Sequence, residues 1–307
     1  MTRPSKTNLG ASVRQRLLNL SRREQENFNL LLSRYAIERL LYRLSQSSVA
    51  EQFVLKGAAL FAVWTGKLHR PTQDLDLLGY GDSSIEHLQV IFMMLCTLPV
   101  EADGLTFDST SIRIEEIREG LVYGGQRVHL LAYLDGAIIP VQIDIGFGDT
   151  VMPSPTWLVY PTLLTFPPPQ LRMYPKESVI AEKVHAMVVL DIDNSRMKDF
   201  YDLWTLSRLF AFEGTMVTQA IQATFERRQT LLPLTVPTGL TAEFAGDSNK
   251  LVQWRAFLSR NRLDVGSASF ADIIVHLHTF LWPPLQALAE STPFLAQWSP
   301  QGPWRTV

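Results

Sequence analysis

Apolar residues in the first fifty positions recur at mostly three- and four-residue intervals, with arginines between them. This spacing predicts a helical region over residues 11–49. The apolar run at 53–55 ends at residues 56–57, Lys-Gly, which is typical of a buried strand followed by a turn. Residues 58–64 then have the composition of a short helix, and Gly66 is placed to end it.

One more short strand, a helix and three longer strands are predicted next along the chain. Leu75, Leu77 and Leu78 predict a strand that carries Asp74 and Asp76, and an amphipathic helix is expected next, over residues 83–98. Alternating apolar and polar residues predict three longer strands, the last two joined by a hairpin at Asp135-Gly136, with turns at Gly120 and at Gly124-Gly125. These strands span residues 105–118, 127–134 and 138–147.

The pattern changes after Pro153, where six prolines predict an extended connector with little regular structure. Helical periodicity then returns in five segments: 177–190, 198–210, 215–228, 248–260 and 269–290. The predicted fold class is therefore α+β, with a mixed sheet and a C-terminal helical domain. The expected order is a basic helical region (1–50), an α/β domain (51–152), a proline-rich connector (153–173) and a helical domain (174–307).

Composition narrows the class of protein. The chain has 307 residues, of which 46% are hydrophobic and 19% charged, with a formal net charge of −2, and this balance excludes a disordered protein. A single cysteine, Cys96, indicates a reducing compartment. The longest apolar stretch, residues 90–100, is about half of a membrane span. We therefore expect a cytoplasmic protein with no membrane partner.

Charge is unevenly distributed along the chain. Residues 1–50 contain nine Lys or Arg and three Glu, a local excess of +6. Such a segment could follow a phosphate backbone, or it could be an ordinary solvated helix face.

The acids near residue 75 are the most informative feature. On a strand Asp74 and Asp76 point to the same face, where two close carboxylates repel each other unless a cation lies between them. Mg²⁺ prefers one or two carboxylates together with phosphate oxygens, and a third acid on a neighbouring strand would complete a site for nucleotidyl transfer. Asp144 is the lone charge in an apolar strand and supplies that third acid. Taken alone, these residues could instead be a solvated loop and an outward-facing edge position.

Lys56, Gly57 and Ala58 stand at the predicted strand-to-helix junction, where free backbone N–H groups favour an anion. Gly57 would let the backbone approach a phosphate, and Ala58 would keep that approach clear. Arg70, before the acid pair, could clamp a phosphate or pair with the aspartates in the empty site.

In this order the motifs resemble the AbiEii/MenT nucleotidyltransferase toxins of the polymerase-β-type superfamily. The similarity runs from about residue 12 to residue 210. It rests on Tyr35–Ser45, on Phe53–Leu60, on Arg70-x-Thr72-x-Asp74-x-Asp76-Leu77, on Ile143-Asp144, on Ile180–Ala186 and on Arg196-x-Lys198-Asp199-x-Tyr201-Asp202-Leu203. One departure is Gly57-Ala58-Ala59, where many relatives carry Gly-Ser or Gly-Gly-Thr; the chain therefore lacks a hydroxyl contact to a phosphate at this turn.

The resemblance implies a role for each matching residue. Asp74 and Asp76 would bind the metal, Mg²⁺ or Mn²⁺, with Asp144 as third ligand. Lys183 would contact the nucleoside triphosphate, and Asp199 would be an acid of the second domain that activity requires. From the residues alone, Lys183 could be a surface lysine, and Asp199 and Asp202 could be solvated or paired with Arg196, Lys198 or Arg208.

The expected function is that of a Mg²⁺-dependent nucleotidyltransferase. The resemblance implies the toxin of a bacterial toxin–antitoxin or phage-defence pair, with a winged-helix antitoxin as partner. It also implies transfer of a nucleotide from a nucleoside triphosphate to RNA, in some relatives the tRNA 3′ end, which blocks translation. Two alternatives remain open: a transferase for a small molecule such as an antibiotic, and a nucleotide-binding module without catalysis.

Overall fold

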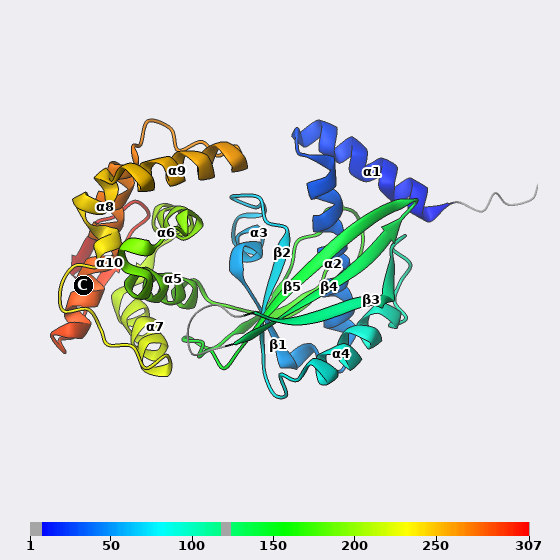
Figure 1. Cartoon of the computed structure of the whole chain (residues 1–307), viewed down its shortest axis with the longest axis horizontal. Coiled ribbons are helices and arrows are strands. Elements are labelled where there is room, and N and C mark those ends of the chain that lie inside the picture. The colour runs from blue at the N-terminus through cyan, green and yellow to red at the C-terminus, as the bar shows by residue number, and fades with distance from the viewer. Residues whose placement is uncertain (1–7, 118–123, 307) are drawn as a thin grey trace, which may run out of the picture. The chain divides into compact units, whose positions relative to one another are not determined.

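The hydrophobic pattern folds as two separate units in the computed structural model, which describes residues 8–117 and 124–306 (Figure 1). The N-terminal unit comprises Met1–Gly148 and Thr156–Met173, and the C-terminal unit comprises Asp149–Pro155 and Tyr174–Val307.

The predicted N-terminal helical region consists of two helices, α1 (Leu9–Glu24) and α2 (Phe28–Gln46). Gln25 ends α1 in the left-handed conformation, with φ of 54°. The side chain of Asn27 then accepts hydrogen bonds from the amides of Asn29 and Leu30 and so caps α2. Apolar periodicity runs through both helices, which is why it did not reveal the break.

A seven-stranded sheet forms the centre of the N-terminal unit, in the order β3-β4-β5-β2-β1-β7-β6. Two neighbouring pairs, β1/β7 and β2/β5, are parallel and the others are antiparallel, so the predicted mixed sheet is confirmed. The strands are β1 (Phe53–Lys56), β2 (Asp74–Gly79), β3 (Thr106–Ile117), β4 (Gly125–Leu134), β5 (Ala137–Phe147), β6 (Thr156–Val159) and β7 (Gln170–Met173). The predicted hairpin between β4 and β5 is present, while the predicted turn at Gly120 lies outside the described residues.

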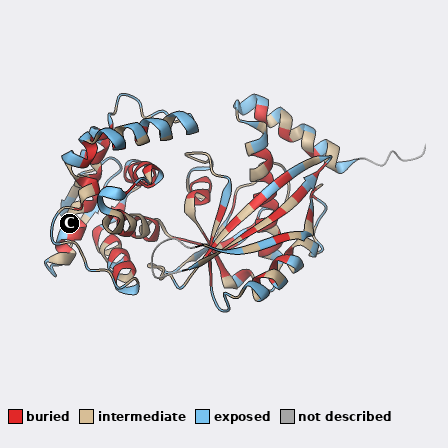
Figure 2. Cartoon of the chain, viewed as in Figure 1, coloured by how far each residue is buried: buried red, intermediate tan, exposed pale blue. Residues whose placement is uncertain are grey.

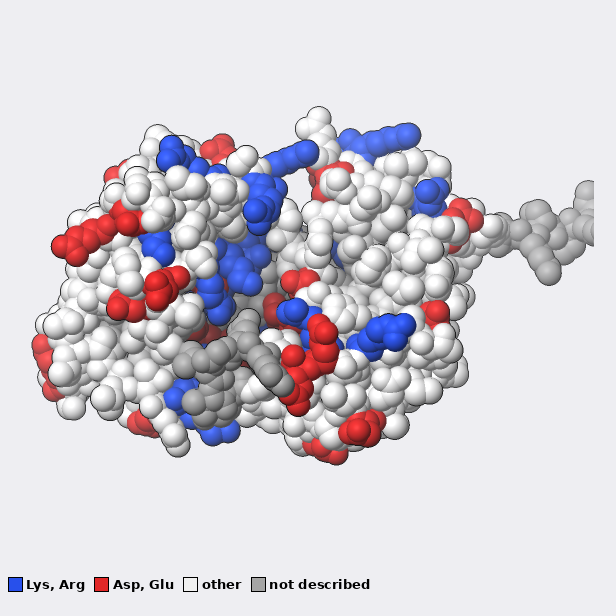
Figure 3. All heavy atoms as spheres, in the orientation of Figure 1, with Lys and Arg blue, Asp and Glu red and all other residues white. Residues whose placement is uncertain are grey.

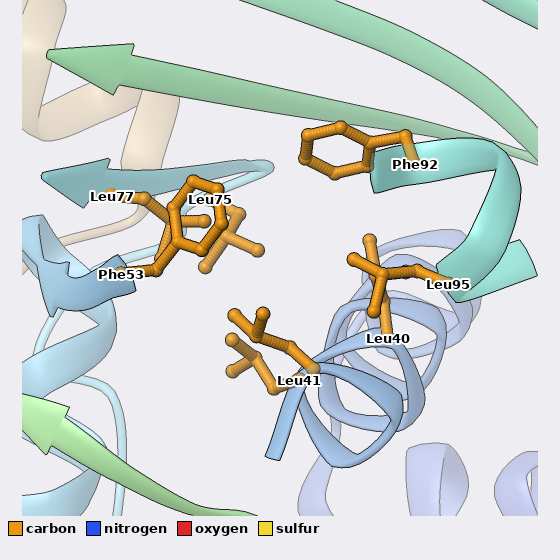
Figure 4. A pocket seen from close by; sticks show the side chains of 8 residues that line it. Leu40, Leu41, Phe53, Leu75, Leu77, Phe92 and Leu95 are labelled. Carbon is orange, nitrogen blue, oxygen red and sulfur yellow. The ribbon is translucent and has the colours of Figure 1, made fainter. Parts of the chain in front are cut away.

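The two faces of this sheet differ in character. Along β5, Val141, Ile143 and Ile145 are buried, whereas Gln142 and Asp144 are half-buried, and Figure 2 shows this alternation along the long strands. Helices α2 and α4 (Ile85–Thr97) cover the apolar face. Their side chains meet those of β1 and β2 around a small space lined only by apolar residues (Figure 4), which is part of the core and offers no polar group to a ligand.

The segment predicted to be a connector without regular structure differs from that prediction. Residues 156–159 and 170–173 form β6 and β7, which pair with each other, and β7 also pairs with β1. The prolines at 161 and 167–169 lie between the two strands, where no ladder hydrogen bond is required of them. The segment is therefore an edge of the sheet.

The C-terminal unit is mainly helical, as predicted. It contains α5 (Lys176–Leu190), α6 (Met197–Leu209), α7 (Gly214–Arg227), α8 (Ala242–Gly246), α9 (Ser248–Asn261) and α10 (Phe270–Ala289). Stacked, tilted and edge-to-face ring contacts among Phe200, Phe244 and Phe270 join α6, α8 and α10. A three-stranded sheet that the sequence did not predict is formed by β8 (Phe212–Glu213), β9 (Ala296–Trp298) and β10 (Trp304–Thr306). Among the helices that the structure describes, none has the length and apolar character needed to cross a membrane.

The apolar face of β5 gives a direct test of the core. Ile143→Ala should lower the free energy of unfolding by about 2–5 kcal/mol, because the fully buried side chain leaves a cavity. Ile138→Ala, on the same strand but 62% exposed, is the control and should change it by less than about 0.5 kcal/mol. Urea unfolding of both variants measures the difference. Equal losses would contradict the assigned faces of the strand.

Candidate active site

The acid pair lies on β2 as predicted. Asp74 is exposed and Asp76 half-buried, while Leu75 and Leu77 point into the core, so the two carboxylates share the polar face. Strand β5 runs parallel beside β2, with Asp144 directly opposite Asp76. Neighbouring strands are about 4.8 Å apart, and residues in register point to the same face. The structure thus brings Asp144, distant in sequence, next to the pair.

The polar row continues onto the strands at either side. Lys56 lies opposite Asp76 on β1, and Arg127 lies opposite Asp144 on β4. Across β1, β2, β5 and β4 the row therefore reads basic, acidic, acidic, basic. Two like charges side by side are unfavourable, and the flanking cations offset part of that repulsion.

Arg127 forms the best-defined contact in the row. Its Nε and Nη2 atoms each donate a hydrogen bond of 2.7 Å to the carboxylate of Asp144, one to each oxygen. This bidentate bond and the charge of Asp144 raise the pKa of Arg127. Sequence reasoning missed Arg127, because its signal, a polar position in an alternating strand, gains meaning only once the register with β5 is known.

Gly57 lies directly against the acid pair. It has φ of 76° and starts the 3₁₀ turn Gly57–Ala59, which continues into α3 (Leu60–Thr65). A Cβ atom at this position would overlap the carboxyl group of Asp76, at 2.6 Å from Cγ. Only glycine fits both the backbone conformation and the space. The turn that was predicted to approach a phosphate therefore lies against Asp76.

For the other two residues predicted to line a phosphate, Ala58 and Arg70, the structure gives weaker support. Ala58 is buried, so only its backbone could meet a nucleotide. Arg70 is half-buried, and its guanidinium donates a long hydrogen bond, 3.4 Å, to the carbonyl of Pro71. Its role as a phosphate clamp stays a prediction.

A second group of charges lies within the C-terminal unit. The ammonium of Lys183 on α5 is 2.6 Å from Oδ1 of Asp199 and 2.8 Å from Oδ2 of Asp202, both on α6. Nε of Arg196 is 2.7 Å from Oδ2 of Asp199. The Lys183 side chain is 13% exposed, which excludes the interpretation as a surface lysine. Of the pairings left open by the sequence, the one with Arg196 is observed.

These contacts keep Asp199 ionised. Burial alone would raise the pKa of this carboxyl, but the charges of Lys183 and Arg196, with the hydrogen bond from Lys183, outweigh it and hold the pKa below its usual range. Asp199 and Asp202 are buried and Lys183 is nearly so, and removing Lys183 therefore takes away a charge that balances both carboxylates.

Part of the basic helical region is closed to the phosphate backbone that it could have followed. Arg39 and Arg43 on α2 are buried, and Arg43 donates a 2.7 Å hydrogen bond to Asp103. Arg34 donates to both oxygens of Glu26 at 2.7 Å. These arginines stabilise the fold because their side chains pack between elements. Arg3 and Lys6 lie outside the described residues.

Carboxylates are the donors that Mg²⁺ prefers, so Asp74 and Asp76 fit that ion by chemistry and by their shared face. Oδ2 of Asp144 keeps a second lone pair beside its bond to Arg127, whereas Oδ1 also accepts a 3.3 Å hydrogen bond from the side chain of Gln142. In the part of the chain that the structure describes, however, no three His, Cys, Asp or Glu side chains gather closely enough to hold a metal ion. Asp74, Asp76 and Asp144 are therefore on adjacent strands in register, but their side chains are not close enough together to form a three-carboxylate site.

A mixed sheet with acids on its polar face and a separate helical unit define an α+β protein. The chain belongs to the AbiEii family, since the model of the nucleotidyl transferase AbiEii toxin of type IV toxin–antitoxin systems matches residues 39–276.

Two crystal structures from Helicobacter pylori also match. JHP933 has 14% identity and a TM-score of 0.46, over 85% of this chain and 90% of that chain. A protein assigned as a nucleotidyltransferase has 14% identity and a TM-score of 0.47, over 86% and 98%. No curated protein matches the sequence.

The close approach of Gly57 to Asp76 predicts an unequal effect of two glycine substitutions. Gly57→Ala and Gly66→Ala both force alanine into positive φ, at a cost of about 1–2 kcal/mol each. Only Gly57→Ala also drives a methyl group into Asp76, which should add about 1–3 kcal/mol, because a Cβ at Gly66 meets open space. Chemical unfolding measures both variants. A larger loss for Gly66→Ala would contradict the geometry.

The charge group around Lys183 predicts a pH-dependent loss of stability. Lys183→Met should lower the free energy of unfolding by about 3–5 kcal/mol at neutral pH, because Asp199 and Asp202 lose the buried cation that both contact, while the ion pair of Asp199 with Arg196 remains. Because the pKa of Asp199 is depressed, its contribution is present above the ordinary carboxyl pKa of about 4 and is lost as pH falls through the folded value.

The difference in free energy of unfolding between wild type and Lys183→Met should therefore become smaller at acidic pH. Lys198→Met, which removes an exposed lysine of α6, is the matched control and should change stability by less than about 0.5 kcal/mol at every pH. Unfolding curves between pH 3 and pH 8 measure both differences. A gap that stays constant would contradict the role of the buried carboxylates.

Proposed function

We propose that this AbiEii-family chain transfers a nucleoside monophosphate from a nucleoside triphosphate to an RNA acceptor, the 3′ end of tRNA, with Mg²⁺ as cofactor. As a toxin of a toxin–antitoxin pair it would thereby stop translation, with a winged-helix antitoxin as its partner. The observation that carries the proposal is the register of β2 and β5, with Asp144 opposite Asp76 and Asp74 on the same face.

In this proposal Asp74 and Asp76 hold the metal, with Asp144 facing it from β5. The cation would polarise the α-phosphate and stabilise the charge of the leaving pyrophosphate. Arg127 orients Asp144 through its two hydrogen bonds, which fix that carboxylate in place. Lys56 and the backbone of Gly57 would line the phosphate side, and Gly57 has no side chain to obstruct it.

Lys183 is the proposed contact to the triphosphate from the C-terminal unit. A lysine binds polyphosphate as a compact point charge, and its three donors allow it to bond phosphate while it keeps a carboxylate partner. Asp199 and Asp202 hold the ammonium in one place. The requirement for an acid that the family resemblance implies at Asp199 would then have a physical reason, since this carboxylate positions Lys183.

Transfer to a small molecule is a second candidate that one observation favours. The arginines of α2 are buried or paired, so the basic segment no longer argues for RNA by itself. The choice of acceptor therefore needs a direct measurement.

Purified protein with Mg²⁺, each α-labelled triphosphate in turn and total tRNA should give labelled tRNA with one preferred nucleotide. Asp76→Asn should reduce the rate by about 10³-fold or more, because loss of a metal ligand removes several kcal/mol of stabilisation. Glu86→Gln, an exposed acid on α4, is the control and should retain full activity. EDTA should stop the reaction and excess Mg²⁺ should restore it.

Unchanged transfer by Asp76→Asn would contradict the assigned site. Release of pyrophosphate without label on tRNA would contradict the acceptor and direct the search to small molecules. Binding of a triphosphate without any pyrophosphate release would favour a module that does not catalyse.

A further inference from the structure

Helix α9 (Ser248–Asn261) has one face that is exposed and free of acidic residues. The exposed residues of that face are Ser248, Asn249, Val252, Arg255, Ala256, Ser259 and Arg260. At 100° per residue, Arg255 and Arg260 stand at the two edges of this arc, and the residues between them are uncharged. Arg262 follows at the end of the helix and is also exposed.

The opposite side of α9 is anchored in the C-terminal unit, so the basic face has a fixed direction. Trp254 is buried and stacks on Phe270 with ring centroids 4.9 Å apart. Lys250 is also buried, and its ammonium donates a 3.0 Å hydrogen bond to the carbonyl of Asn194. The fourth cation of this segment is therefore used internally, and the other three face outward.

The three outward arginines have no acidic partner among the residues that the structure describes. Arg255 donates only to the carbonyl of Leu251, one turn earlier on its own helix. By contrast, the half-buried Arg34 and Arg228 each form an ion pair. Figure 3 shows basic side chains gathered over the part of the C-terminal unit that contains α9 and α6. Exposed cations left without carboxylates favour an anionic partner from outside the chain.

We propose that the α9 face, defined by Arg255, Arg260 and Arg262, binds the phosphate backbone of the RNA acceptor. This inference rests on the proposed function and names a surface for its macromolecular substrate. A polyanionic backbone matches a face with three arginines and no acid, and small residues such as Ala256 and Ser259 let it approach closely. The core of a protein–protein interface requires apolar area, and this face has little of it.

The test compares two triple variants with equal loss of charge. One is Arg255→Gln/Arg260→Gln/Arg262→Gln. The control is Arg113→Gln/Arg227→Gln/Arg305→Gln, which removes exposed arginines of β3, α7 and β10. Binding of fluorescent tRNA is measured by anisotropy at several salt concentrations, and thermal unfolding verifies that both variants fold. The labelling assay is run on the same preparations.

The α9 variant should bind tRNA at least about 10-fold more weakly, and the slope of log affinity against log salt should fall by about 2–3, because each lost phosphate contact contributes about 0.7–0.9. The control should stay within about 2-fold of wild type. Equal binding of tRNA by the two variants would overturn the inference about α9. If the wild type still labels tRNA, the proposed function would stand. If the α9 variant loses tRNA binding but the wild type labels no tRNA, the α9 face would remain an RNA-binding surface and the proposed function would be overturned.

Discussion

The parallel pairing of β2 with β5 is the constraint on which the candidate site depends. It places Asp144 opposite Asp76 although 67 positions separate them in the sequence. Side chains on a strand alternate between faces, so a slip of one residue would turn the acids into the core and the leucines out. The buried residues that flank each acid, Leu75, Leu77 and Ile143 among them, therefore fix the register as firmly as they stabilise the sheet.

The two units use their arginines differently. In the N-terminal unit, Arg39 and Arg43 are buried beside acids of the fold, and burial raises the pKa of the neighbouring Glu38 to about 7. Such side chains stabilise packing and are closed to a phosphate. The exposed arginines of α9 form no ion pair with the residues that the structure describes, and Trp254 and Lys250 anchor the opposite side of the helix. Charge counted along the sequence therefore says little about charge presented at a surface.

Much of the fold could be predicted from the sequence because short-range patterns determine it. The alternation of β5, the hairpin at Asp135-Gly136 and the acids on β2 follow from local periodicity and turn chemistry. Asp144 could be singled out as the only charge in an apolar strand.

The remainder depends on contacts between distant residues. Arg127 joins the site only through the pairing of β4 with β5. The strands β6 and β7 are four residues each and lie among prolines, so their pattern is too short to identify. Burial of Arg39 follows from packing against residues more than a hundred positions away, such as Pro167, whose carbonyl accepts its hydrogen bond. None of these facts has a local signal.

In the proposed function, the polar face of the sheet holds a divalent cation between residues that the register brings together. The decisive measurement is electron paramagnetic resonance of bound Mn²⁺ with a non-hydrolysable triphosphate present. We expect tight Mn²⁺ binding by the wild type and loss of binding in Asp74→Asn/Asp76→Asn, with Glu86→Gln unchanged. Undiminished binding by the double variant would show that the cation lies elsewhere and would overturn the proposed site.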